Sequence, residues 1–148
     1  MRLIRAWAYC AATDAVFATV LSVIYGRGPA GVWKGVAATP FGSDMLNQGA
    51  RATLIGLGIH LCVAFTWSTI LFLLVTRISA LARLLESPFG IMKVAVIYGP
   101  CIWLFMSFVV IQLATHQPPA ITYRWWIQLA GHILFVATPI AVGLKQKR

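Results

Sequence analysis

The sequence predicts an all-α membrane protein, in which four transmembrane helices form one bundle over residues 1–148. The composition is 60% hydrophobic and only 10% charged, whereas about a quarter of the residues of a soluble domain are charged. Four apolar stretches are long enough to cross a bilayer, which takes roughly 20 residues of helix. No stretch alternates apolar and polar residues as a barrel strand does, so each span should be a helix.

The first span runs approximately from Ile4 to Tyr25 and follows Arg2 and Arg5. A secretory signal also combines positive charge with an apolar run, but Asp14 interrupts this run and no small-residue cleavage motif follows it. We therefore expect an uncleaved first span. The other spans run approximately from Ala52 to Val75, from Ile91 to Leu113 and from Trp126 to Leu144.

The connection between the first two spans, residues 26–48, is long and rich in glycine. Within it, the piece from Pro29 to Ala37 is weakly amphipathic and contains Trp33. Because proline suits the first turn of a helix, we expect a short helix lying on the outer membrane surface. Ser43 with Asp44 is predicted to cap the N-terminus of the second helix.

The two later connections are shorter. Residues 76–90 are predicted to be a polar and basic loop, in which Ser87 and Pro88 mark the start of the third span. Residues 114–124 contain Pro118 and Pro119 and are predicted to form a rigid turn. Four spans joined in this way place both termini on the same side of the membrane.

Positive charge is distributed unequally between the two sides. Eight of the 12 Lys and Arg residues fall on the side of the termini, which predicts that both termini are cytoplasmic. This group is Arg2, Arg5, Arg77, Arg83, Lys93, Lys145, Lys147 and Arg148, and the opposite group is Arg27, Lys34, Arg51 and Arg124. The opposite side is also predicted to carry the aromatic belt, with Tyr25, Trp33, Tyr123, Trp125 and Trp126.

Three ionisable side chains, Asp14, His60 and His132, lie near the middles of the spans. Ionisable groups are expensive in hydrocarbon, so they face a protein interior and usually have partners there. Burial favours the neutral form of each group. We expect any function of the protein to concentrate at these three residues.

Small residues recur at four-residue spacing, which lets helices in lipid approach closely. In the first two spans the ionisable residue occupies the centre of such a row. The rows are Ala6, Cys10, Asp14, Ala18 and Ser22 in the first span, and Ala52, Gly56, His60, Ala64 and Ser68 in the second. The third span has Ala95, Gly99 and Ser107, and the fourth has Gln128 one turn before His132 with Gly131 beside it.

The two histidines have similar depths in the membrane. Each lies about 5 Å to the outer side of the middle of its helix, and Asp14 lies near the middle of its own. We therefore predict a connected polar core of Asp14, His60 and His132, with Ser107 and Gln128 as hydrogen-bonding partners. The segments GIHLCVAFT and GHILFVAT also resemble one another, which suggests two similar hairpins related by an axis along the membrane normal.

Other chemistry has little support in the sequence. Cys10, Cys62 and Cys101 fall inside spans, where cysteine packs as a small apolar residue. There is no CxxC motif, phosphate-binding glycine motif or nucleophile motif, so neither a metal site nor an enzyme is favoured. The basic residues lie beside the spans and not on one face, which indicates contact with anionic lipid and not with nucleic acid.

Several segments resemble the uncharacterised bacterial inner-membrane proteins of the YagU-like family. They are GIHLCVAF in the second span, YGPCIWLFMSFVV in the third and RWWIQLAGHILF entering the fourth. The resemblance covers most of the chain after about residue 30, and its fixed points are His60, Trp103, Met106, Pro118, Pro119, Gly131 and His132. It implies a helical bundle in a bacterial inner membrane, without an assigned biochemical activity. Some relatives carry an acidic residue shortly before the last histidine, where this chain has Gln128.

Three classes of function remain open. In the first, the ionisable residues only fix helix packing, and the protein is a structural or accessory subunit of a larger complex or a homo-oligomer. In the second, they serve a proton- or ion-coupled transport component, because imidazole titrates nearest to neutral pH. In the third, His60 and His132 ligate one haem axially in a redox protein. We expect that the protein binds no cofactor, and haem is the cofactor implied by the third class.

Overall fold

The computed structural model describes residues 1–145, and this part of the chain is helical without any strand. Four helical segments are long and apolar enough to span a membrane, namely Arg2–Ile24, Gly49–Arg77, Gly90–Thr115 and Tyr123–Leu144. These bounds differ from the predicted ones by at most three residues. The prediction of an all-α protein with four membrane-spanning helices is thus confirmed.

Two of the spans are interrupted by a π-helical turn. The first span is α1 (Arg2–Ile24) and the second is α3 (Gly49–Arg77). The third joins α5 (Gly90–Phe105), the π turn η2 (Met106–Ile111) and α6 (Gln112–Thr115), and the fourth joins α7 (Tyr123–Gly131), the π turn η3 (His132–Ala137) and α8 (Thr138–Leu144). Between the spans lie α2 (Gly31–Phe41), the 3-10 turn η1 (Ser43–Asn47) and α4 (Ser79–Glu86).

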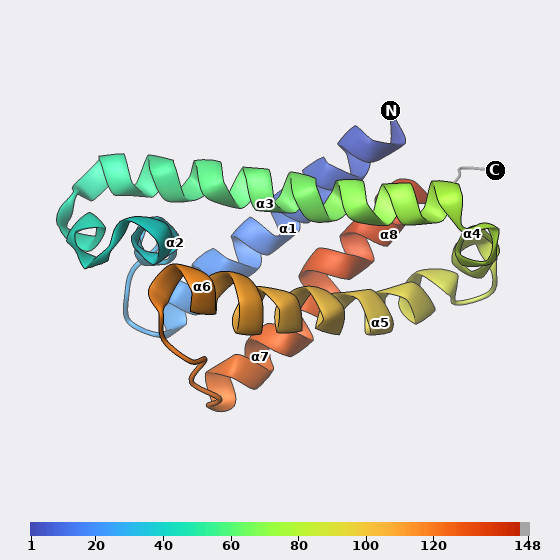
Figure 1. Cartoon of the computed structure of the whole chain (residues 1–148). Helices are drawn as coiled ribbons and strands as arrows, with labels where there is room; N and C mark the ends of the chain where they lie inside the picture. Colours follow the sequence, from blue (N-terminus) through green and yellow to red (C-terminus); the bar gives the residue numbers. More distant parts are fainter. Residues whose placement is uncertain (146–148) are drawn as a thin grey trace.

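The four spans lie together in one bundle (Figure 1), in which Trp67 of α3 contacts Tyr98 and Phe105 of α5. Helix α1 packs against α3 on one side and against η3 and α8 on the other, while α5 packs against η3 and α8. Helices α3 and α5 lie at the two ends of this series and are also joined through the short helices. At one end of the molecule α2 packs on α3 and α6, and at the other end α4 packs on α3 and α5.

Both ends of the described chain lie at the α4 end of the bundle (Figure 1). The Arg5 guanidinium donates from Nε to the Gly143 carbonyl and from Nη2 to the Lys145 carbonyl, each at 2.8 Å. Arg2 lines a small hollow there together with Thr76 and Glu86. We call this part of the bundle the terminal half and the part that contains α2 and α6 the cavity half. Lys147 and Arg148, which belong to the predicted basic tail, lie outside the described residues.

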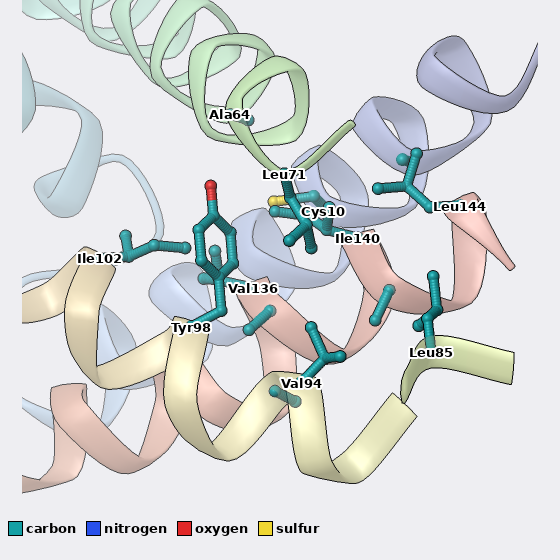
Figure 2. Packing of buried hydrophobic residues seen from close by; sticks show 14 of the residues in the cluster. Cys10, Ala64, Leu71, Leu85, Val94, Tyr98, Ile102, Val136, Ile140 and Leu144 are labelled. Atoms are coloured by element: carbon teal, nitrogen blue, oxygen red, sulfur yellow. The ribbon is translucent and has the colours of Figure 1, made fainter. Parts of the chain in front are cut away.

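The interior of the terminal half is filled by apolar side chains from all four spans and α4. Leu71, Leu85, Ile140 and Leu144 are each at most 2% exposed, and Figure 2 shows them converging with Val94 and Tyr98. Gly143 on α8 lies directly against the backbone of Ala6 on α1, so any side chain there would overlap it. The close approach of α1 and α8 depends on this glycine.

Several details of the connections differ from the predictions. Residues 76–90 are not a simple loop, because they contain the amphipathic helix α4, whose Leu85 is buried in the core. Ser43 and Asp44 do not cap the second helix, because they form the separate 3-10 turn η1 and α3 begins at Gly49. The third span begins at Gly90, and the Ser87 hydroxyl instead bonds to the Leu84 carbonyl at the end of α4.

The short helix expected after the first span is present, but it begins at Gly31 and not at Pro29. It packs against the bundle, with Trp33 and Ala37 buried. Trp33 and Trp125 are buried and therefore do not belong to the predicted aromatic belt. Tyr25 and Tyr123 do lie at this end of the bundle, where the Arg124 guanidinium lies 4.2 Å and 5.7 Å from their ring centres.

Candidate functional site

The rows of small residues bring α1 and α3 into contact at the level of the ionisable groups. All five residues of the predicted row on α3 are buried, and so are Ala6, Cys10 and Ser22 of the row on α1. Because these side chains are short, the two helices approach closely enough for Asp14 to face His60. The Asp14 side chain remains 22% exposed, against 9% for His60.

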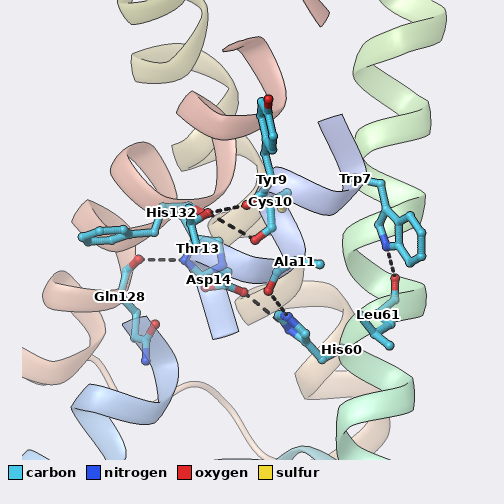
Figure 3. A network of polar contacts seen from close by, with 11 residues as sticks. Trp7, Tyr9, Cys10, Ala11, Thr13, Asp14, His60, Leu61, Gln128 and His132 are labelled. Atoms are coloured by element: carbon cyan, nitrogen blue, oxygen red, sulfur yellow. Dashed lines mark hydrogen bonds and ion pairs between the residues drawn. The ribbon is translucent and has the colours of Figure 1, made fainter. Parts of the chain in front are cut away.

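Asp14 and His60 form the first contact of the site. Asp14 Oδ2 lies 3.6 Å from His60 Nδ1, which is an ion-pair distance but longer than a hydrogen bond (Figure 3). The other ring nitrogen, His60 Nε2, lies 3.1 Å from the Ala11 carbonyl oxygen. Since a carbonyl only accepts, Nε2 carries a proton and the tautomer of neutral His60 is fixed.

His132 joins the same cluster from the fourth span. Its Nδ1 donates to the Gln128 carbonyl one turn earlier, at 2.7 Å, which leaves Nε2 as the acceptor nitrogen of the neutral ring. Asp14, His60 and His132 line the same cavity, and Figure 3 shows them close together. The structure therefore brings the three predicted residues to one place, with a direct contact between Asp14 and His60.

The π turn that begins at His132 has a local cause. Pro139 lacks an N–H and cannot satisfy the Phe135 carbonyl, which is four residues earlier in the chain. The Thr13 hydroxyl on α1 lies 2.7 Å from that carbonyl oxygen and equally close to the Tyr9 carbonyl of its own helix, so its one proton can serve the Phe135 carbonyl. This bond ties α1 to the fourth span one residue away from Asp14. π turns of this kind are frequent at functional sites.

The three ionisable groups line a cavity of about 320 Å³ between α1, α2, α3, η2 and η3. The other lining residues are mostly apolar: Cys10, Val36, Thr39, Pro40, Ile59, Val63, Ala64, Trp67, Ile102, Trp103, Met106, Val110, Ile111, Ala114 and Val136. Three of them, Pro40 on α2, Val110 on η2 and Ala114 on α6, are exposed and form the rim of the cavity. On the side of the terminal half the lining includes Trp67, whose carbonyl accepts a 2.7 Å hydrogen bond from the Tyr98 hydroxyl.

Helix α2 covers part of this cavity. The Trp33 ring packs edge-on against His60 with 5.1 Å between ring centres. Gly56 makes this possible, because any side chain there would overlap the Trp33 carbonyl. Glycine is thus required at this point of α3 by the close approach of another backbone.

The two predicted partners of the core have different positions. Gln128 takes part through its backbone carbonyl, which holds His132. Ser107 lies apart from the cluster, and its hydroxyl accepts a 2.8 Å hydrogen bond from Trp125 Nε1. Within residues 1–145, Ser107 thus joins η2 to α7 and does not contact Asp14, His60 or His132.

The geometry does not support the haem alternative. Axial ligation needs one free nitrogen from each imidazole, directed at a common metal. His132 Nε2 is free, but His60 has one nitrogen bonded to Ala11 and the other facing Asp14. Within residues 1–145 no group of three or more His, Cys, Asp or Glu side chains is arranged to hold a metal ion.

Sequence reasoning missed four contributors to the site. Trp67 and Trp103 lie in the middle of spans, where tryptophan is usually a packing residue, yet both line the cavity. Trp33 was assigned to the membrane interface. Thr13 gave no signal by itself, although Pro139 four residues after Phe135 indicates a carbonyl that needs another donor.

No protein-family model, curated protein or solved structure matches this chain.

Proposed function

We propose that the protein is a proton-coupled transport component of a membrane, in which the cavity receives the substrate and Asp14, His60 and His132 hold the proton. The observation that carries this proposal is that the three groups line one mostly apolar cavity, between its exposed rim at Pro40, Val110 and Ala114 and the buried core of the terminal half. Transporters bind their substrates near the middle of the bilayer, in a site that opens to one side at a time. The apolar terminal half favours such a carrier over a channel, because a channel needs a continuous polar path.

The hydrogen bonds of the site support a role for a proton. Because Nε2 of neutral His60 already carries the ring proton, the approach of Nδ1 to Asp14 is favourable only when one further proton is bound to the pair. That proton resides either on the carboxyl or on the imidazole. Two exchangeable positions for one proton are what a proton-coupled site requires.

The proposal is tested by measuring whether a water-soluble reagent can reach the buried interior of the terminal half. We would replace Cys10, Cys62 and Cys101, introduce Ile140→Cys, and add a membrane-impermeant anionic thiol reagent from the side of the chain termini. Ile140 is fully buried in the terminal half. Asp14→Asn removes the charge that holds the present arrangement, so labelling of this cysteine should be at least roughly tenfold faster in that variant.

The matched control is Val142→Cys, which is on the same helix but 41% exposed on its outer surface. Its labelling should not change with Asp14. If Asp14→Asn proves unstable, the same comparison is made between low and high pH with Asp14 intact. Protection of Ile140→Cys under every condition would overturn the transport proposal and leave the structural role for Asp14, His60 and His132.

We also propose that the membrane is a bacterial inner membrane, as the resemblance to the YagU-like family implies, and that both termini face the cytoplasm. The positive-charge bias of the terminal half supports this orientation. A bundle of four spans is thin for a carrier, so we propose that it works as a homo-oligomer or with a partner subunit. Cross-linking in native membranes tests the assembly, and a protease-accessibility assay of a C-terminal tag tests the orientation.

A further inference from the structure

The charge of the cavity lining is unusual for a chain with a formal net charge of +9. Among the described residues that line the cavity, none is Lys, Arg or Glu, and the titratable groups are Cys10, Asp14, His60 and His132. Helices α2, α5 and α6 and the turn η2 add only uncharged residues to the lining. Asp14 is therefore the only carboxyl group among the described lining residues, and its side chain is 22% exposed.

The rest of the lining suits an apolar molecule with a positive charge. Trp67 and Trp103 are both among the lining residues, and the Trp103 ring lies 4.8 Å from the His132 ring between centres. Indole attracts a cation electrostatically, and the attraction increases when the cation is desolvated. An anionic head would instead meet Asp14 in an apolar site that lacks any Lys or Arg.

Electroneutrality limits how a cation can bind. A cation added to the protonated Asp14–His60 pair would leave one uncompensated positive charge in an apolar cavity, which is costly. If the shared proton leaves when the cation enters, the net charge of the cavity is unchanged. His60 is then neutral, Asp14 is the counter-ion of the ligand, and the proton goes to water at the mouth of the cavity.

From this arrangement we infer that the ligand is an apolar organic cation, such as a substituted ammonium, which exchanges one for one with the proton shared by Asp14 and His60. The inference rests on the proposed transport function and names its substrate class. The exposed rim of Pro40, Val110 and Ala114 admits the apolar part of such a molecule from the bilayer. Val110 lies about 11 Å from the middle of its span, within the roughly 15 Å half-thickness of the hydrocarbon.

The test compares two ligands of the same shape and different charge. Binding of radiolabelled benzyltrimethylammonium to the purified protein in mild detergent is measured by equilibrium dialysis, with neopentylbenzene as the uncharged competitor of equal size. We expect the cation to bind at least tenfold more tightly than neopentylbenzene. Because the cation displaces a proton, its apparent Kd should fall by about tenfold for each unit by which the pH is raised, over the range in which the pair is protonated. A pH indicator should record one proton released for each cation bound.

Variants of the protein distinguish the contribution of the Asp14 charge to binding from the contribution of the cavity volume. Asp14→Asn keeps the shape of the side chain and should abolish cation binding and proton release. Val63→Phe fills the cavity and should abolish the binding of both ligands, whereas Val96→Phe, which is on the exposed face of α5, should change neither. Unaltered cation binding in Asp14→Asn would overturn the inference, even if that variant is less stable than the parent protein.

The outcomes also distinguish the inference from the proposed function. Equal binding of benzyltrimethylammonium and neopentylbenzene, or tighter binding of benzyl alcohol than of the cation, would overturn the assignment of a cation. The transport proposal would survive either result if Ile140→Cys still responds to Asp14. Cation binding with a permanently protected Ile140→Cys would support the ligand class and overturn transport.

Discussion

The terminal half and the cavity half are built from the same four spans but fill their interiors differently. In the terminal half, Leu71, Leu85, Ile140 and Leu144 occupy the space between the helices, and α1 touches α8 through Gly143. In the cavity half, α2 is inserted between α3 and α6, and about 320 Å³ remains beside the ionisable groups. Stability is thus concentrated at one end of the bundle and binding capacity at the other, as is common where function needs a less tightly packed region.

The largest effect is expected from Gly143→Ala in the terminal half. The added methyl group would overlap the Ala6 backbone, which cannot move without separating α1 from α8. We expect a loss of about 3 kcal/mol in the free energy of unfolding, measured by SDS titration in maltoside micelles. Gly58→Ala is the control, because it has open space around it and should be neutral or slightly stabilising. Equal stability of the two variants would refute tight packing at the α1–α8 contact.

A smaller and more local effect is expected from Gly56→Ala in the cavity half. Its methyl group would overlap the Trp33 carbonyl and displace α2 from α3. Because α2 can move while the spans stay together, we expect a loss of about 2 kcal/mol. Hydrogen exchange should increase in residues 31–41 and remain unchanged in α8. Increased exchange throughout the chain would show that the two halves are not independent.

Ser107→Ala tests the hydrogen bond from Trp125 to Ser107, which connects α7 to η2. The Trp125 indole would lose its acceptor while remaining 8% exposed, so we expect a loss of about 1 kcal/mol. Ser107→Thr keeps the hydroxyl and should retain most of the stability. Since Ser107 lies apart from Asp14 and His60, the affinity for benzyltrimethylammonium should stay within a factor of two or so of the parent value. A larger loss of affinity would place Ser107 in the site after all.

The smallest effect on the free energy of unfolding is expected from Thr13→Val, at the boundary between the terminal half and the cavity half. Thr13→Val removes the hydroxyl that satisfies the Phe135 carbonyl, and such bonds in membrane proteins average about 0.6 kcal/mol. Pro139→Ala restores a backbone donor for the same carbonyl. The cost of Thr13→Val should therefore be smaller in the Pro139→Ala background, in a double-mutant cycle. Strictly additive effects would mean that Pro139 does not cause the need for Thr13.

The parts of the fold that follow from simple physical limits were predictable from the sequence. Bilayer thickness sets the length of each span, and the four-residue spacing of small side chains places His60 on the buried face of α3. Helix α4 was also within reach, because Leu81, Leu84 and Leu85 have helical spacing, but its charged residues suggested a loop.

The remaining features depend on pairs of residues that are distant in the sequence. Trp33 is buried only because Gly56 lies opposite its backbone, and an isolated Trp near a span end is usually interfacial. The π turn at His132 depends on Pro139 and on a donor from another helix. The cavity itself depends on the order of the helices, which periodicity does not encode.

The contact of α1 with α8 has a consequence for the biosynthesis of the chain. Of the four spans described, the first in the chain packs against the fourth, through Arg5, Gly143 and the Thr13 hydroxyl. Until the fourth span has been inserted, the partners of α1 among the described elements are α2 and α3, and Asp14 faces His60 without His132. The insertion machinery must therefore hold an incompletely partnered carboxyl in or near the membrane for most of translation, and a chain truncated before α8 should be a preferred substrate for membrane proteases.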